Sequence, residues 1–153
     1  MTTSKKTKTI LLVLLAVTAL VAGIYLATRA QVPENTLAVE YGGKTHYADL
    51  QGVRLTEIHG ERVNGKGEIK PVDGMGFSLH DLLAWTLGED FTCETVAVTA
   101  ADGFGTEVSA AELQEANKAV LLLDEEDGSL QLIVFGDSDS KRSVKDIERL
   151  TVK

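Results

Sequence analysis

Two neighbouring stretches decide how this chain folds: Gly76-Phe77-Ser78-Leu79-His80-Asp81-Leu82-Leu83-Ala84-Trp85 and Val96-Ala97-Val98-Thr99-Ala100-Ala101-Asp102-Gly103-Phe104-Gly105. In the first stretch Ser78 is a typical helix N-cap, and leucines recur behind it at helical spacing. In the second, Val96 and Val98 alternate as in a strand, and Asp102-Gly103 has the composition of a turn. The sequence therefore predicts a helix from Ser78 to Gly88, followed by a strand and a tight polar turn.

Strand patterns surround these two stretches. Gly42-Gly43 and Asn64-Gly65 predict two hairpins, and Pro71 is expected to end the returning strand of the second. The spacing Ser109 to Glu112 matches a capping box and predicts a helix through Glu115. The other expected elements are strands 37–41, 44–47, 53–63, 68–70, 106–108, 119–123 and 130–135, a turn or one-turn helix at 48–50, and a closing segment 143–152 with Val144, Ile147, Leu150 and Val152 in the core. Because strands dominate and helices are short, we expect an α+β fold that is mostly β.

The N-terminus has a different character. Residues 1–9 are polar and basic, and Ile10–Ala27 is a run of 18 residues without a charge. A helix of that length spans roughly 27 Å, close to the thickness of a bilayer's hydrocarbon core. Three lysines precede the run and one arginine follows it, which places the N-terminus inside the cell. We therefore expect a cytoplasmic tail at 1–9, a single-pass transmembrane signal anchor at 10–28, a linker at 29–36 and an extracytoplasmic domain at 37–153.

A cleaved signal peptide is the alternative to an anchor. Thr28-Arg29-Ala30 resembles a cleavage site, and cleavage after Ala30 would give a secreted domain. The apolar run is longer than the usual ~7–15 residues of a signal peptide's hydrophobic region, which favours the anchor. Both alternatives export the domain.

Charge and cysteine content exclude several classes of function. Four of the 15 basic residues lie within the first 30 positions and all 23 acidic residues follow, so residues 31–153 carry a net charge of −12. Such a domain repels phosphate backbones, and we expect no nucleic-acid partner. The single cysteine, Cys93, excludes an internal disulfide and a cysteine-rich zinc site.

The order of these motifs resembles the oxidoreductase molybdopterin-binding domain, the fold of sulfite oxidases and related bacterial enzymes. The matching pieces are Gly76–Leu83, Ala101-Asp102-Gly103-Phe104, Val120–Leu123, Leu130–Phe135, Ser143–Val152 and the opening hairpin with its Asp-Leu, within Leu37–Leu50. The resemblance covers Leu37–Val152. It implies that family's fold, a molybdopterin cofactor and oxidoreductase chemistry.

Several positions depart from the family's pattern. The family's enzymes ligate molybdenum through a cysteine upstream of the helix motif, whereas no residue before Gly76 is a cysteine and Cys93 follows the helix. The active-site tyrosine of the family's turn is Phe104, which has no hydroxyl group. The family's two tryptophans are replaced by Gly74 and Asp146. These departures point away from catalysis.

The candidate binding residues come from the turn and from one basic cluster. The resemblance implies cofactor contacts at Asp102, Gly103 and Phe104, and Lys141, Arg142, Ser143 and Lys145 have the donors to hold an anion such as a pterin phosphate. The alternative for the cluster is a solvated loop that balances Asp137, Asp139 and Asp146.

Other polar groups favour structural roles. Asp124–Gly128 contains carboxylates that suit calcium, but it lacks the spacing of an EF-hand loop, so a solvated hairpin turn is favoured. His46, His59 and His80 lack metal-binding spacing, and Cys93 has no basic neighbour to activate it. We single out no catalytic and no metal-binding residue.

Two functions stay open at this point. The first is a membrane-anchored extracytoplasmic module with this fold that is not catalytic and binds a protein or a small anionic ligand. The second is a molybdopterin-dependent oxidoreductase, or a subunit of one, that binds the cofactor without a cysteine thiolate. The absent cysteine and tyrosine favour the first.

Overall fold

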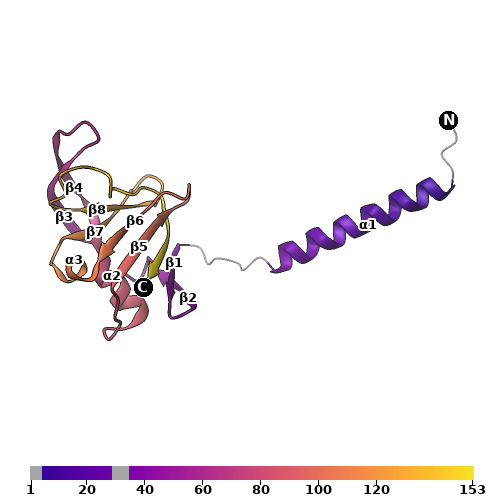
Figure 1. Cartoon of the computed structure of the whole chain (residues 1–153), viewed down its shortest axis with the longest axis horizontal. Helices are drawn as coiled ribbons and strands as arrows, with labels where there is room; N and C mark the ends of the chain where they lie inside the picture. The colour runs from indigo at the N-terminus through magenta and orange to yellow at the C-terminus, as the bar shows by residue number, and fades with distance from the viewer. Residues whose placement is uncertain (1–4, 29–34) are drawn as a thin grey trace. The chain divides into compact units, whose positions relative to one another are not determined.

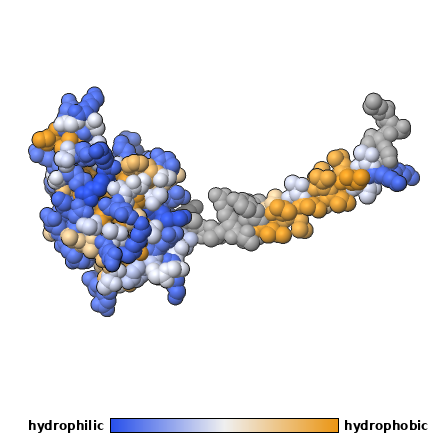
Figure 2. Space-filling view, viewed as in Figure 1, coloured by the Kyte–Doolittle hydropathy of each residue, from blue (hydrophilic) through white to orange (hydrophobic). Residues whose placement is uncertain are grey.

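The structure, a computed structural model, describes residues 5–28 and 35–153 of the chain, which form two compact units divided between Val32 and Pro33. Helix α1 runs from Lys5 to Thr28, and its large apolar side chains from Ile10 to Ile24 are 55–71% exposed. Figure 2 shows this helix as an almost continuous hydrophobic surface, whereas the domain's visible face is mostly hydrophilic. The segment Lys5–Ile24 has a mean hydropathy of 2.2 and is long enough to cross a membrane.

Helix α1 therefore has the length and composition of a signal anchor or a signal sequence. It begins at Lys5, so part of the basic segment expected as a separate tail belongs to the helix. The possible cleavage site at Ala30 and the linker up to residue 34 lie outside the described residues.

Residues 35–153 form an α+β domain of two β-sheets and two short helices, as the sequence predicts (Figure 1). One sheet has the strand order β2-β1-β9-β5-β6, with β1 at Thr36–Tyr41, β2 at Lys44–Asp49, β5 at Thr95–Ala100, β6 at Gly105–Ser109 and β9 at Ile147–Val152. The other has the order β3-β4-β7-β8, with β3 at Thr56–Val63, β4 at Ile69–Ser78, β7 at Ala119–Leu123 and β8 at Leu130–Val134. Helix α2 spans Leu79–Leu87, and α3 spans Ala110–Gln114.

The main core contains side chains of both sheets and of α2. Leu79, Leu82 and Leu83 on one face of α2 are completely buried, and so are Val96 and Leu150 from the five-stranded sheet. A smaller cluster of Ile58, Val72, Val120 and Ile133 lies in the four-stranded sheet, apart from the main core. Because β7 contributes to both clusters, its sequence is a continuous apolar run instead of an alternating one.

The helix termini agree with their sequence signals. The Ser78 hydroxyl accepts a hydrogen bond from the Asp81 backbone at 3.0 Å, and Gly88, with φ at 98°, follows the last turn of α2. Ser109 and Glu112 form the predicted capping box of α3. Each cap satisfies backbone groups that the helix itself leaves unpaired.

Three local predictions are wrong. Pro71 does not end its strand, because β4 continues without interruption to Ser78. Strand β7 pairs with β4 only at residues 76–78, so the missing N–H of Pro71 costs no hydrogen bond on that side. Ala48 and Asp49 are not a turn or a helix but the last residues of β2, and Thr36 belongs to β1 instead of the linker.

Gly76 provides a test of the packing between β4 and β7. A Cβ built at Gly76 would overlap the Leu121 carbonyl oxygen, whereas one at Gly74 would lie 3.4 Å from Leu122 Cδ2, an ordinary contact. We predict that Gly76→Ala lowers the free energy of unfolding by about 1–3 kcal/mol, because the strands must separate. The matched variant Gly74→Ala should change it far less. Urea denaturation of both variants measures the difference, and equal losses would contradict this account.

Candidate functional site

A depression on the surface of the domain has a volume of about 570 Å³. Its wall comes from four elements that are distant in sequence: the β3–β4 hairpin, the β5–β6 turn, strand β8 and the loop that precedes β9. This arrangement brings together four of the residues proposed from the sequence, namely Asp102, Phe104, Ser143 and Lys145. Gly103, Lys141 and Arg142 are not among the residues that line it.

The β5–β6 turn shapes one side of this depression. The Asp102 carboxylate accepts a hydrogen bond from the Phe104 backbone at 2.9 Å, and Ala100 and Phe104 pair through their backbones at 2.8 Å. Gly103 has φ at 87°, a conformation that suits glycine, and it forms the tip of the turn. The Asp102 carboxylate therefore holds the turn, while the Phe104 ring is 52% exposed at the depression's edge.

Lys145 and Arg62 are the two cations of the depression. Within residues 35–153, neither side chain makes a hydrogen bond or an ion pair. Asp146, which also lines the depression, has φ at 52°, and its carbonyl accepts from the Ala101 backbone at 3.0 Å. That bond fixes the loop to the β5–β6 turn, so the two walls of the depression are joined.

Arg62 and Gln131 are lining residues that the sequence analysis missed. Arg62 lies in β3 two residues before the hairpin turn, and Gln131 lies in β8, so neither belongs to a recognisable motif. The Gln131 Nε2 atom is buried and has no hydrogen-bond partner in the described part of the chain. No local signal predicts that these positions meet the Ser143–Asp146 loop.

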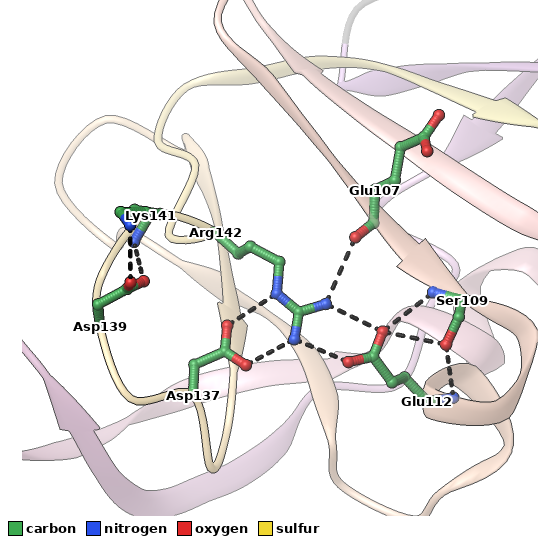
Figure 3. A network of polar contacts seen from close by, with 7 residues as sticks. All are labelled: Glu107, Ser109, Glu112, Asp137, Asp139, Lys141 and Arg142. Carbon is green, nitrogen blue, oxygen red and sulfur yellow. Dashed lines mark hydrogen bonds and ion pairs between the residues drawn. The ribbon is translucent and has the colours of Figure 1, made fainter.

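Arg142 does not line the depression and is paired with two carboxylates. Figure 3 shows its guanidinium between two carboxylates, at 2.7 Å from Glu112 Oε1 and 2.5 Å from Asp137 Oδ1. The carboxylates of Asp137 and Glu112 raise the pKa of Arg142, and the hydrogen bonds from Arg142 lower the pKa of Glu112 to about 2. The capping carboxylate of α3 is thus also the anchor of the loop that follows β8.

Lys141 lies on the surface beside Asp139, at 3.3 Å (Figure 3). Arg142 and Lys141 thus have the carboxylate partners that the solvated-loop alternative expects, Asp137 and Asp139. Lys145 differs from both, because no carboxylate pairs with it among the described residues.

A second depression of about 330 Å³ shares Gln131, Lys145 and Asp146 with the first. Its other wall includes Asp124 and Asp127 of the β7–β8 turn, whose carboxylates accept hydrogen bonds from the Glu126 and Ser129 backbones, both at 2.8 Å. These bonds shape a hairpin turn. Among the described residues, no group of three or more His, Cys, Asp or Glu side chains is arranged to hold a metal ion.

The histidines and Cys93 lie outside the larger depression. His59 is in the middle of β3, not at a strand end, and its Nδ1 lies 2.6 Å from Asp73 Oδ1, which raises the pKa of His59. The His80 ring packs against the Phe91 ring, with 5.6 Å between the two ring centroids. Cys93 is half-buried in the segment between α2 and β5, and burial raises the pKa of its thiol. A raised pKa makes a reactive thiolate unfavourable.

Comparison with known proteins gives no assignment, because neither a family model nor a curated protein sequence matches the chain. The geometry of the depression is therefore the basis for any functional conclusion.

The network of Arg142 gives a prediction on stability. Since the pKa of Glu112 falls from an ordinary 4.5 to about 2 on folding, its contribution is complete above pH 4.5 and is lost as the pH falls through about 2. We predict that Glu112→Gln lowers the free energy of unfolding by about 1–3 kcal/mol at pH 7, because a charge-paired group is removed. The difference from the native chain should shrink on acidification below pH 4.5.

Chemical denaturation at a series of pH values measures this effect. Glu115→Gln is the matched control, because Glu115 is exposed and follows the same helix. We expect the control to stay within about 0.5 kcal/mol of the native chain. A Glu112→Gln difference that is independent of pH would contradict the ionic origin of the stabilisation.

Proposed function

We propose that this chain is a membrane-anchored extracytoplasmic module that resembles the oxidoreductase molybdopterin-binding domain. In this proposal the domain is not catalytic, and it binds a protein or a small anionic ligand at the 570 Å³ depression. Helix α1 supports the anchor, because it is apolar, exposed and long enough to span a bilayer. The lysines before it support an N-terminus on the cytoplasmic side.

The observation that carries the binding function is the pair of free cations in one depression. Residues 31–153 carry a net charge of −12, yet Arg62 and Lys145 line the same surface without a carboxylate partner in the described domain. Lys44, Arg54, Lys66 and Lys118 also lack an ion pair among the described residues, so Arg62 and Lys145 are set apart by lining one depression together, beside Asp102 and Asp146. Ser140 and Ser143 add hydroxyl groups to the same wall. This donor set suits an oxyanion or an acidic side chain of a partner.

The residues present fit an anion better than a molybdenum centre. A molybdenum site of the resembled family requires a soft thiolate ligand, and Cys93, the chain's one cysteine, does not line the depression. Phe104 stands at the turn without a hydroxyl to donate. The alternative function, a molybdopterin-dependent oxidoreductase completed by a partner chain, is favoured by the same Arg62, Lys145 and serine donors, which suit a phosphate group.

Metal analysis distinguishes the two functions. We predict that the full-length chain, purified from its native membrane, contains no stoichiometric molybdenum and no pterin absorption in its ultraviolet-visible spectrum. About one molybdenum atom per chain would overturn the non-catalytic proposal and support the alternative.

A charge reversal tests whether the depression binds. We predict that Arg62→Glu with Lys145→Glu abolishes retention of the ligand or partner, because two attractive charges become repulsive. Mass spectrometry identifies the small molecules that denaturation releases and the proteins that copurify with the chain from the native membrane. Lys44→Glu with Arg54→Glu is the matched control, because it makes the same change in net charge at exposed residues outside the depression. Identical sets of bound molecules in both double variants would reject the site.

A further inference from the structure

Trp85 is the chain's one tryptophan, and it lies on the surface of the domain. Its side chain is 62% exposed, although Leu82, Leu83 and Ala84 directly before it on α2 are buried. The proposed function gives this residue no role, because Trp85 does not line either depression described above. A large indole ring in water forgoes the gain that burial of its apolar area would bring.

The neighbours of Trp85 place it beside the start of the domain. A Cβ at Gly52 would lie 3.2 Å from Trp85 Cζ2, so the ring rests against the turn that follows β2. In that turn the Leu50 backbone N–H donates to the Asn35 carbonyl at 3.1 Å. Asn35 directly precedes β1, so the indole and the first described residue of the domain share one end of the β1–β2 hairpin.

The chain between the two units is short. Residues 29–35 connect Thr28, the last residue of α1, to Thr36, the first of β1. Even fully extended, eight residue steps reach roughly 25–30 Å. If α1 spans the membrane, the start of β1 and the surface beside it stay within that distance of the helix end.

We infer that Trp85 inserts into the headgroup region of the membrane that holds α1, and that this end of the β1–β2 hairpin is the domain's lipid-facing surface. The inference rests on the proposed membrane anchor. Tryptophan suits this place, because its ring is apolar and its indole N–H can still reach water or a headgroup. The anchor supplies the proximity, so one inserted side chain suffices to orient the domain.

The lipid that fits is zwitterionic. Residues 31–153 carry a net charge of −12, and Glu89 and Asp90 follow α2. Phosphatidylcholine presents no net charge to repel them, whereas anionic phosphatidylglycerol does. Insertion of Trp85 should therefore weaken as the fraction of anionic lipid rises and recover when salt screens the repulsion.

Tryptophan fluorescence tests the inference on the full chain, because Trp85 is the only indole in the sequence. The chain is reconstituted into phosphatidylcholine vesicles, with and without lipids brominated near the headgroup. We expect a blue-shifted emission, protection from acrylamide and a loss of emission with the brominated lipid. Emission that acrylamide quenches as fully as a free tryptophan derivative, and that brominated lipid leaves unchanged, would overturn the inference.

A relocated reporter is the matched control. Trp85→Phe combined with Lys44→Trp moves the indole to the exposed first residue of β2, beside the turn at the opposite end of the β1–β2 hairpin. We expect this reporter to stay accessible to acrylamide and unaffected by brominated lipid. Equal quenching of both reporters would mean that the domain lies on lipid without a preferred face, and this would also overturn the inference.

A separate measurement tests whether α1 remains as a membrane anchor. Mass spectrometry of the chain recovered from its native cells shows whether the segment up to Ala30 has been removed. A processed, water-soluble chain would reject the anchor together with the inference. An intact, membrane-embedded chain with a solvent-accessible Trp85 would reject the inference alone and leave the anchor in place.

Discussion

The five-stranded sheet depends on its central strand, β9. Strand β9 lies in the middle of the five-stranded sheet, parallel to β1 on one side and antiparallel to β5 on the other. Leu150 is completely buried and Val152 nearly so, and the backbone of Lys153 pairs with Thr95 at 2.9 Å. Without these six residues, β1 and β5 would have no common neighbour. The order of the five-stranded sheet thus requires β9 between β1 and β5.

The loop before β9 connects this constraint to the candidate site. Arg142 fixes the loop to α3 through Glu112, and Val144, completely buried, anchors it in the core. Ser143 lies between these two fixed residues, and Lys145 follows Val144. Both Ser143 and Lys145 line the depression. The salt bridges of Arg142 thus hold the loop that carries Lys145.

Local features of the fold can be predicted from the local sequence, whereas the residues of the candidate site cannot. Ser78, Gly88 and the Ser109–Glu112 pair mark the helix ends correctly, because a cap is decided by residues within one turn of it. The parallel pairing of β1 with β9 joins residues more than a hundred positions apart, and no local pattern specifies that register. Arg142 illustrates the same limit: its place beside Lys141 suggests an anion site, while its partner Glu112 lies thirty residues earlier. Arg62 pairs locally with Lys70 in the β3–β4 hairpin, but the residues that it meets in the depression come from the β5–β6 turn, β8 and the loop before β9.

If the domain is anchored and binds as proposed, the short connection between α1 and β1 would raise the concentration of its binding partners at the membrane. A short tether holds a binding module at an effective concentration in the millimolar range toward anything else confined to the same surface. A weak interaction at an open depression of this kind would then be occupied for partners in the membrane and nearly empty for the same molecules in bulk solution. The length of the tether would act as a filter on which partners the domain meets.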